Sequence, residues 1–161
     1  MSDTVLLTGW GRTAPTAARV GGLGALSSPG PRGAIARGLG RAYGDAAQNA
    51  GGTVIDMTSR DRVLSFHDGV ITVEAGISLG ALIAEVLPSG WFVPVTPGTQ
   101  HVTVGGAIAS DVHGKNHHRD GSFSRHVTSL KLASPSGSHV LEPGAPGYEG
   151  RFNSKRSRVR V

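Results

Sequence analysis

The chain has 161 residues, with 16 Lys or Arg against 11 Asp or Glu and a formal net charge of +5. This length allows one domain with a hydrophobic core. The absence of Cys excludes disulfides, thiolate metal ligands and a cysteine nucleophile. No apolar run comes near the roughly 20 residues that a membrane helix needs, and no signal-peptide pattern is visible, so we expect neither segment.

The positive charge is concentrated in residues 150–161. This stretch contains no acid and five basic residues, namely Arg151, Lys155, Arg156, Arg158 and Arg160. Over residues 1–149 the other 11 basic residues are matched by 11 acidic ones. A basic face on the folded part is therefore not indicated, and we expect no specific nucleic-acid partner.

Turn residues and apolar runs predict a series of short elements in the first half of the chain. Residues 19–33, rich in Gly, Ser and Pro, predict a loop or linker. After it, apolar runs predict strands at 33–37, 53–57, 63–66 and 70–76. The last two flank Asp68 and Gly69, a dipeptide typical of a β-hairpin turn.

A helix is predicted next at 77–90, where Leu, Ile and Val recur at helical spacing. Ser78 is placed to cap its start, and Pro88 and Gly90 are placed to stop it. The later elements are predicted as a strand at 91–95, a short helix opening 104–114 and a strand with a turn at 126–137. Short strands with interspersed helices predict an α+β fold.

The stretch IARGLGRAYGD at 35–45 combines three glycines with Arg37 and Arg41, directly after a predicted strand. The glycines match neither the Rossmann fingerprint nor the P-loop. Glycines nevertheless allow backbone amides to converge on phosphate oxygens, and the two arginines could add charge-assisted hydrogen bonds. The alternative is a glycine-rich surface turn with two solvated arginines.

A second glycine-rich segment covers residues 97–123 and suggests backbone lying against a large planar or phosphorylated ligand. His113, His117 and His118 raise the alternative of a metal site. No carboxylate stands at a recognised zinc spacing, so a metal is not favoured. The serines of this segment lack the sequence of a nucleophile elbow, so a catalytic triad is not supported either.

Three stretches carry a resemblance to a known family: LTGWGRTAP at 7–15, IARGLGRAYGDAAQNAGGTVIDM at 35–57 and VPVTPGTQHVTVGGAIASDVHGKNHHRDGSFSRHV at 93–127. They resemble the flavin-binding half of the decaprenylphosphoryl-β-D-ribose 2'-oxidase family, in the vanillyl-alcohol-oxidase class of FAD-linked oxidases. The resemblance covers about residues 7–142. It implies a PCMH-type FAD-binding domain made of two small α/β subdomains, with FAD as the cofactor.

By this resemblance the first glycine cluster wraps the FAD pyrophosphate with backbone amides, and the second passes along the flavin and the phosphates. The cofactor-binding residues that it implies are Ala36, Arg37, Gly38, Leu39, Gly40, Arg41, Ala42, Tyr43, Gly44, Asp45, Ala46, Gly98, Thr103, Val104, Gly105, Gly106, Ser110, Asp111, Val112 and His113. His113 and Lys115 are implied to face the sugar substrate and are the candidate catalytic residues. The resemblance implies no metal.

The implied reaction is the oxidation of the 2'-hydroxyl of a lipid-linked phosphoribose, with hydride transfer to the flavin. It is a step towards the arabinose donor of the actinobacterial cell wall. The implied partners are FAD and the lipid-linked phosphoribose, with a partner chain that supplies the substrate half as a further expectation. A cytoplasmic location is the default expectation, with membrane association or an envelope-facing position as the alternatives.

The sequence departs from the family within the phosphate loop and at its end. Ala42 and Ala46 stand where the family has serine and asparagine, and residues 143–161 resemble no part of it. We therefore expect an N-terminal segment at 1–34, the FAD-binding domain at 35–142 and a disordered basic tail at 143–161, truncated before the substrate domain. The alternatives are a stand-alone flavin or nucleotide-binding module and an inactive remnant without turnover.

Overall fold

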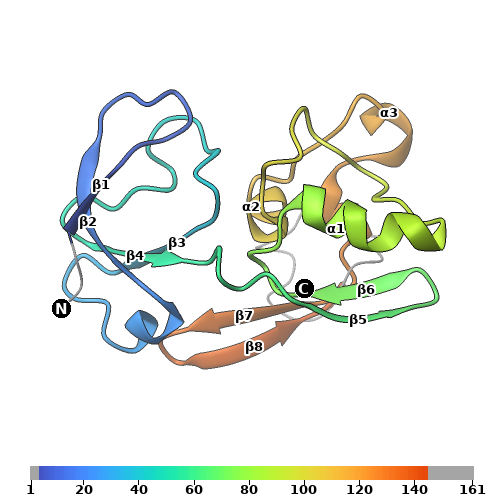
Figure 1. Ribbon diagram of the computed structural model, residues 1–161. Coiled ribbons are helices and arrows are strands. Elements are labelled where there is room, and N and C mark those ends of the chain that lie inside the picture. Colours follow the sequence, from blue (N-terminus) through green and yellow to red (C-terminus); the bar gives the residue numbers. More distant parts are fainter. Residues whose placement is uncertain (1–3, 145–161) are drawn as a thin grey trace. The chain divides into compact units, whose positions relative to one another are not determined.

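The computed structural model describes residues 4–144 of the chain (Figure 1). The chain divides into two compact units, Met1–Ser59 and Arg60–Val161. Strands and short helices are mixed along it, so the mixed α/β character predicted from the sequence is confirmed. The predicted domain boundaries stay a prediction, and residues 145–161 of the expected basic tail lie outside the described residues.

The first unit is built on a four-stranded sheet with the order β1-β2-β4-β3. Its strands are β1 (Thr4–Leu7), β2 (Thr16–Gly21), β3 (Ala34–Arg37) and β4 (Thr53–Asp56). The pair β1–β2 is antiparallel, whereas β4 runs parallel to both β2 and β3. Because β4 is central, its residues Thr53, Val54 and Ile55 are buried.

Two of the four strands were predicted and two were not. The strands expected at 33–37 and 53–57 are confirmed as β3 and β4. The loop expected at 19–33 is wrong at its start, because Arg19–Gly21 complete β2 and pair with Thr53–Ile55. A 3₁₀ helix, η1 (Leu23–Ser27), follows within the same stretch. Glycine-rich composition indicated a loop, but pairing with a distant strand determines the structure here.

The second unit begins with the expected hairpin, β5 (Val63–His67) and β6 (Val70–Val73). Its two turn residues, Asp68 and Gly69, both have positive φ, at 51° and 74°. A two-residue turn with both central φ angles positive is the type I′ turn that suits the twist of paired strands. The hairpin prediction is confirmed.

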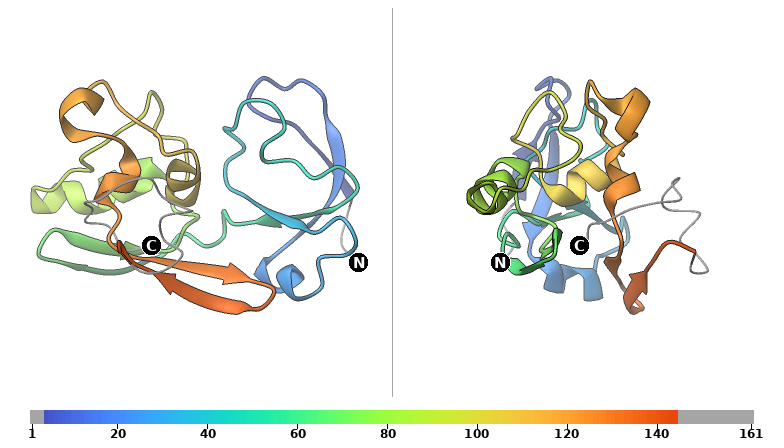
Figure 2. Two further views of the ribbon diagram at one scale, coloured as in Figure 1. Left: turned by 180° about the vertical axis from the view of Figure 1, so that it is seen from behind. Right: turned by 90° about the vertical axis from the view of Figure 1, so that its right-hand side faces the viewer.

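Helix α1 (Leu79–Val86) packs over this hairpin (Figure 1, Figure 2). The Ser78 hydroxyl accepts a hydrogen bond from the Ala81 N–H at 3.1 Å, so it caps the helix as expected. The helix passes into η2 (Leu87–Ser89) and ends at Gly90, whose φ is 81°. The predicted helix and its start and stop signals are confirmed.

The strand expected at 91–95 is wrong. Val93 and Val95 are buried, but the described residues include no strand paired with this segment. The Asn116 side chain donates instead to the Pro94 carbonyl oxygen at 3.0 Å. Pro94 has no N–H to donate to a neighbouring strand, which disfavours strand pairing at this apolar run.

The rest of the second unit completes the core around α1. Helix α2 (Val104–Ala109) confirms the predicted short helix. The strand predicted at 126–137 starts later, as the hairpin β7 (Leu130–Ser134) and β8 (Gly137–Leu141). Not predicted were α3 (His117–Asp120) and η3 (Phe123–His126). No helix within residues 4–144 has the length and apolar character to cross a membrane, and membrane association stays a prediction.

Candidate functional site

The first glycine loop, residues 38–46, leaves strand β3 at Arg37. Its glycines Gly40 and Gly44 have positive φ, at 67° and 64°, which bends the backbone into a turn that most side chains resist. Within residues 4–144, no backbone N–H of residues 38–46 donates a hydrogen bond. A run of backbone donors without acceptors can bind an anion where the donors converge.

The carbonyl groups of the same loop, in contrast, are used by the protein. The Trp10 N–H donates to the Ala42 carbonyl oxygen at 2.9 Å, and the Gln48 N–H donates to the Asp45 carbonyl oxygen at 2.8 Å. A Cβ atom on Gly9 would clash with the Gly44 carbonyl oxygen. The loop is therefore held through its acceptors, whereas its N–H donors have no acceptor within the described residues.

The two arginines of this loop have different roles. Arg37 donates to the carbonyl oxygens of Ala47 at 2.8 Å and Thr8 at 2.7 Å, and its guanidinium lies where a side chain on Gly40 would be. Both of these hydrogen bonds are made to the protein, whereas we expected Arg37 to donate to an anion. The two bonds stabilise the loop.

Arg41 has one N–H donor without a hydrogen-bond partner within the described residues. Its Nη1 donates to the Leu39 carbonyl oxygen at 2.6 Å, and its guanidinium lies 4.7 Å from the centre of the Trp10 ring. Its Nε is buried and has no hydrogen-bond partner within the described residues. A buried guanidinium donor without an acceptor is costly, so this atom is also suited to an anionic ligand.

In the second glycine-rich segment, at the start of α2, the backbone amides are paired within the protein, unlike those of the first glycine loop. The Val104 and Gly105 N–H groups donate to the carbonyl oxygens of Ile77 and Ala75, both at 2.8 Å. The Gly106 N–H donates to the Thr103 hydroxyl at 3.1 Å. These amides are therefore satisfied within the protein, and contact of these residues with a cofactor stays a prediction.

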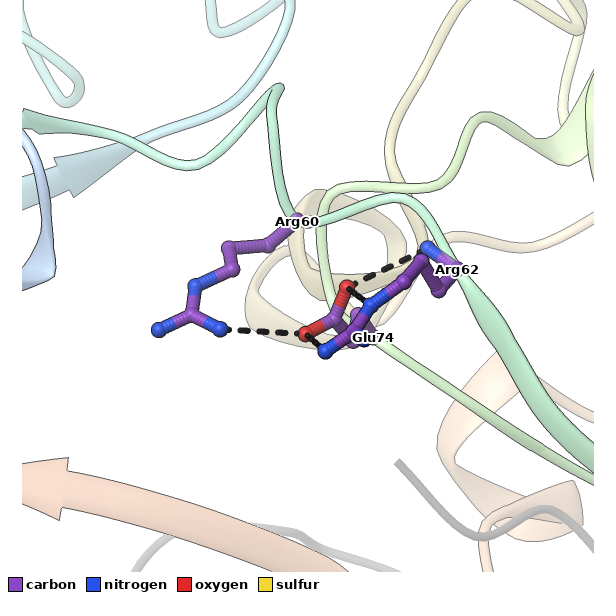
Figure 3. A network of polar contacts seen from close by, with 3 residues as sticks. All are labelled: Arg60, Arg62 and Glu74. Carbon is purple, nitrogen blue, oxygen red and sulfur yellow. Dashed lines mark hydrogen bonds and ion pairs between the residues drawn. The ribbon is translucent and has the colours of Figure 1, made fainter.

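The Ala75 and Ile77 carbonyl groups that accept these hydrogen bonds follow Glu74 in the sequence. The Glu74 carboxylate lies between two arginines (Figure 3). Arg60 Nη1 donates to Glu74 at 3.2 Å, and the Arg62 guanidinium donates to both carboxylate oxygens at 3.1 Å. The hydrogen bond from Arg62 lowers the pKa of Glu74 from 4.5 to about 2, against the opposing effect of burial. Sequence analysis missed this cluster because its members are 14 and 12 residues apart.

Asp111, expected to lie against the flavin ring, uses its carboxylate within the protein. Its oxygens accept from the Ser122 hydroxyl at 2.8 Å and the Ser124 N–H at 3.0 Å. Burial acts to raise the pKa of Asp111, but these hydrogen bonds outweigh it and lower the pKa. The described contacts of Asp111 therefore hold the 110–113 loop in place. Ser110 beside it is exposed, and its N–H donates to the Gly106 carbonyl oxygen.

Three of the predicted site residues line one groove of about 710 Å³, which we call the histidine groove. They are Gly98, His113 and Lys115. His113 and Lys115 are exposed, whereas Gly114 between them is buried. Gly114 packs so closely against Thr96 that a Cβ there would lie 2.7 Å from the Thr96 carbonyl oxygen. The wall residues that sequence analysis missed are Phe92, Val93, Pro94, Thr96, Pro97, Gly114, Asn116 and His117.

The histidines of this region lie near one another without forming a metal centre. The ring centres of His113 and His117 are 5.2 Å apart, and those of His117 and His118 are 6.0 Å apart. Within residues 4–144, no group of three His, Cys, Asp or Glu side chains is placed to hold a metal ion.

The chain matches a known family over residues 32–141, more than half of its length, and that family is described as an FAD binding domain. The chain belongs to this family. FAD is the cofactor of the family, and it fits what the first glycine loop offers, because a pyrophosphate supplies the anionic oxygens that unpaired backbone and guanidinium donors lack.

Two similar proteins are longer than this chain. The FAD binding domain described here is 49% identical over 158 residues to decaprenylphosphoryl-beta-D-ribose oxidase of Mycolicibacterium smegmatis, covering 90% of this chain and 34% of that protein. It is 51% identical over 74 residues to an uncharacterized protein of the mprA 5' region of Streptomyces coelicolor, covering 45% of this chain and 20% of that protein. The chain therefore spans about a third or less of these relatives.

A comparison of folds agrees with this family. A solved structure of alkyldihydroxyacetonephosphate synthase superposes with a TM-score of 0.69 over 89% of this chain and 32% of that one, at 16% identity. At this identity the likeness concerns the fold alone. The predicted PCMH-type fold is confirmed.

Proposed function

We propose that this chain carries the FAD-binding part of an oxidoreductase that oxidises a hydroxyl group of a lipid-linked sugar phosphate. The observation that carries the proposal is the run of backbone N–H groups at 38–46 that donate to no acceptor within the described residues. The 49% identity to decaprenylphosphoryl-beta-D-ribose oxidase supports the substrate class. Bound FAD would supply the electron acceptor of the oxidation.

In this proposal the residues of the first glycine loop hold the cofactor through its pyrophosphate. The amides of 38–46 donate to the phosphate oxygens, and Arg41 adds its unpaired Nε. Arg37 keeps the loop in shape through Ala47 and Thr8 and needs no contact with the cofactor. The changes to Ala42 and Ala46 leave this binding intact, since it rests on the main chain.

The histidine groove is the place where this proposal puts the substrate. The Lys115 ammonium is exposed there and can pair with the phosphate of the substrate. The His113 ring lies along the same groove and can orient the reacting hydroxyl through a ring nitrogen. A partner chain that supplies further substrate contacts belongs to the same proposal, and substantial turnover by this chain alone would contradict that part.

The test is FAD binding by a pair of matched variants. Ala46→Asp puts a carboxylate at an exposed position of the first glycine loop, and Ala50→Asp puts one at an exposed position of the same unit beyond it. Repulsion between the new carboxylate and the pyrophosphate should weaken FAD binding at least about tenfold in the first variant and leave it unchanged in the second. Flavin absorbance after gel filtration measures both.

Two results would contradict the proposal. One is a folded wild-type protein that takes up no added FAD. The other is equal FAD affinity in the Ala46→Asp and Ala50→Asp variants, which would place the pyrophosphate elsewhere.

A further inference from the structure

Trp10 lies in the turn after strand β1 and contacts the first glycine loop with both its backbone and its ring. Its N–H donates to the Ala42 carbonyl oxygen at 2.9 Å. Its ring carries the guanidinium of the preceding loop residue, Arg41, whose Cζ lies 4.7 Å from the ring centre. The backbone bond places the indole beside the loop, and the ring then meets the one arginine of this loop that has an unpaired donor.

Burial in the hydrophobic core does not explain the position of this ring, because Trp10 is 49% exposed. Its contact with Arg41 does. A guanidinium over the face of an aromatic ring is attracted by the negative charge of that face, and tryptophan is the strongest such partner among the aromatic residues. The Trp10 ring therefore holds a cation in place at the surface of the loop.

The Arg41 guanidinium is restrained at a second point as well. Its Nη1 donates to the Leu39 carbonyl oxygen at 2.6 Å. With one nitrogen bonded and one face on the ring, the orientation of this planar group is fixed, while its Nε stays buried without a hydrogen-bond partner within the described residues. An arginine that is already ordered loses less conformational freedom when it binds an anion.

We propose that Trp10 is a positioning residue for FAD binding, because its ring holds the Arg41 guanidinium ready to donate to the pyrophosphate. This inference rests on the proposed function, and it adds to the site a residue that sequence analysis did not include. Trp10 acts through Arg41 and needs no contact of its own with the cofactor.

The test is a double-mutant cycle on the full chain, with FAD affinity measured by titration of flavin fluorescence. Arg41→Met removes the donor and should weaken FAD binding at least about tenfold. Trp10→Leu removes the ring and should weaken it about fivefold. The double variant should bind FAD no more weakly than Arg41→Met alone, because the ring has no effect once the guanidinium is gone.

A purely structural role of Trp10 predicts a different cycle. The loss from Trp10→Leu would then be the same with Arg41 present or replaced, so the two losses would add, and the inference would be overturned. Unchanged FAD affinity in Arg41→Met would overturn it as well. The Trp10 backbone bond to Ala42 is available to every variant, so the cycle compares side chains alone.

Two single variants test whether the aromatic face matters. Trp10→Phe keeps such a face and should bind FAD within about twofold of the wild type. A loss as large as that of Trp10→Leu would contradict the inference. Trp91→Leu is the matched control, because Trp91 is 48% exposed, close to the value for Trp10, and belongs to the other unit. It should leave FAD affinity unchanged.

Failure of the proposed function is distinguishable from failure of this inference. If the folded wild-type protein binds no FAD, both fail. If Ala46→Asp weakens FAD binding as proposed and Trp10→Leu binds FAD as tightly as the wild type, the pyrophosphate site stands and only the role of Trp10 fails.

Discussion

The Arg37 guanidinium donates to the Ala47 carbonyl oxygen at 2.8 Å, which ties the start of the first glycine loop to the residue after its end. A second bond to the Thr8 carbonyl oxygen connects the loop to the segment after β1. The Arg37 side chain thus stabilises the shape of the first glycine loop. The unpaired amides of 38–46 depend on that shape.

Replacing Arg37 with methionine should therefore reduce both stability and FAD affinity. The change leaves two carbonyl oxygens without their donor, which costs about 1–3 kcal/mol of unfolding free energy. Urea unfolding and FAD titration measure the two effects. Arg32→Met is the matched control, because Arg32 is exposed and its side chain makes no hydrogen bond within the described residues. Equal unfolding midpoints for the two variants would contradict this role.

Glu74 should make the stability of the protein depend on pH in the acid range. Its pKa is lowered from 4.5 to about 2 in the folded protein, so the folded state favours the charged form. The stabilisation is complete above pH 4.5 and is lost as the pH falls towards 2. Glu74→Gln should flatten the loss of stability across this window.

The measurement for Glu74 is the urea midpoint at a series of pH values. Glu85→Gln serves as the control, because Glu85 is exposed on α1 and forms no ion pair within the described residues. If Glu74→Gln and the wild type lose stability in parallel between pH 4.5 and 2, the Arg62 pair does not control this titration.

Gly114→Ala should destabilise the histidine groove. The new Cβ would lie 2.7 Å from the Thr96 carbonyl oxygen and 2.7 Å from the Asn116 side-chain oxygen, so the segment that carries His113 and Lys115 must move away from Thr96. Overpacking of this kind costs about 1–3 kcal/mol. Gly98→Ala is the control on the same groove, because its Cβ would meet nothing within 4 Å. Thermal unfolding compares them, and equal melting temperatures would contradict the prediction.

Local signals in the sequence predicted the elements that local chemistry determines. Asp68 and Gly69 make a hairpin turn because both adopt positive φ, and Ser78 starts a helix because its hydroxyl accepts from the Ala81 N–H. Strand β2 was missed because it exists through pairing with β4, a contact between residues far apart in sequence.

The sequence predicted some residues of the candidate site but not their hydrogen bonds. Glycine content located the two glycine-rich segments, and the resemblance to a family added the groove residues Gly98, His113 and Lys115. It did not show that Arg37 bonds to the protein, nor that the α2 amides are satisfied while those of 38–46 are not. Those facts depend on which carbonyl lies opposite each donor, and sequence spacing carries no information about that. Phe92 was missed because an exposed aromatic residue has no signature until a groove is seen beside it.

The central claim is that the amides of 38–46 bind the FAD pyrophosphate, and amide hydrogen exchange with and without FAD tests it most directly. The amides of 104–106 are bonded within the protein and provide the internal reference. We predict fast exchange of 38–46 in the free protein and marked slowing on addition of FAD, with a much smaller change at 104–106. Exchange of 38–46 that is equally fast with FAD bound would contradict the account.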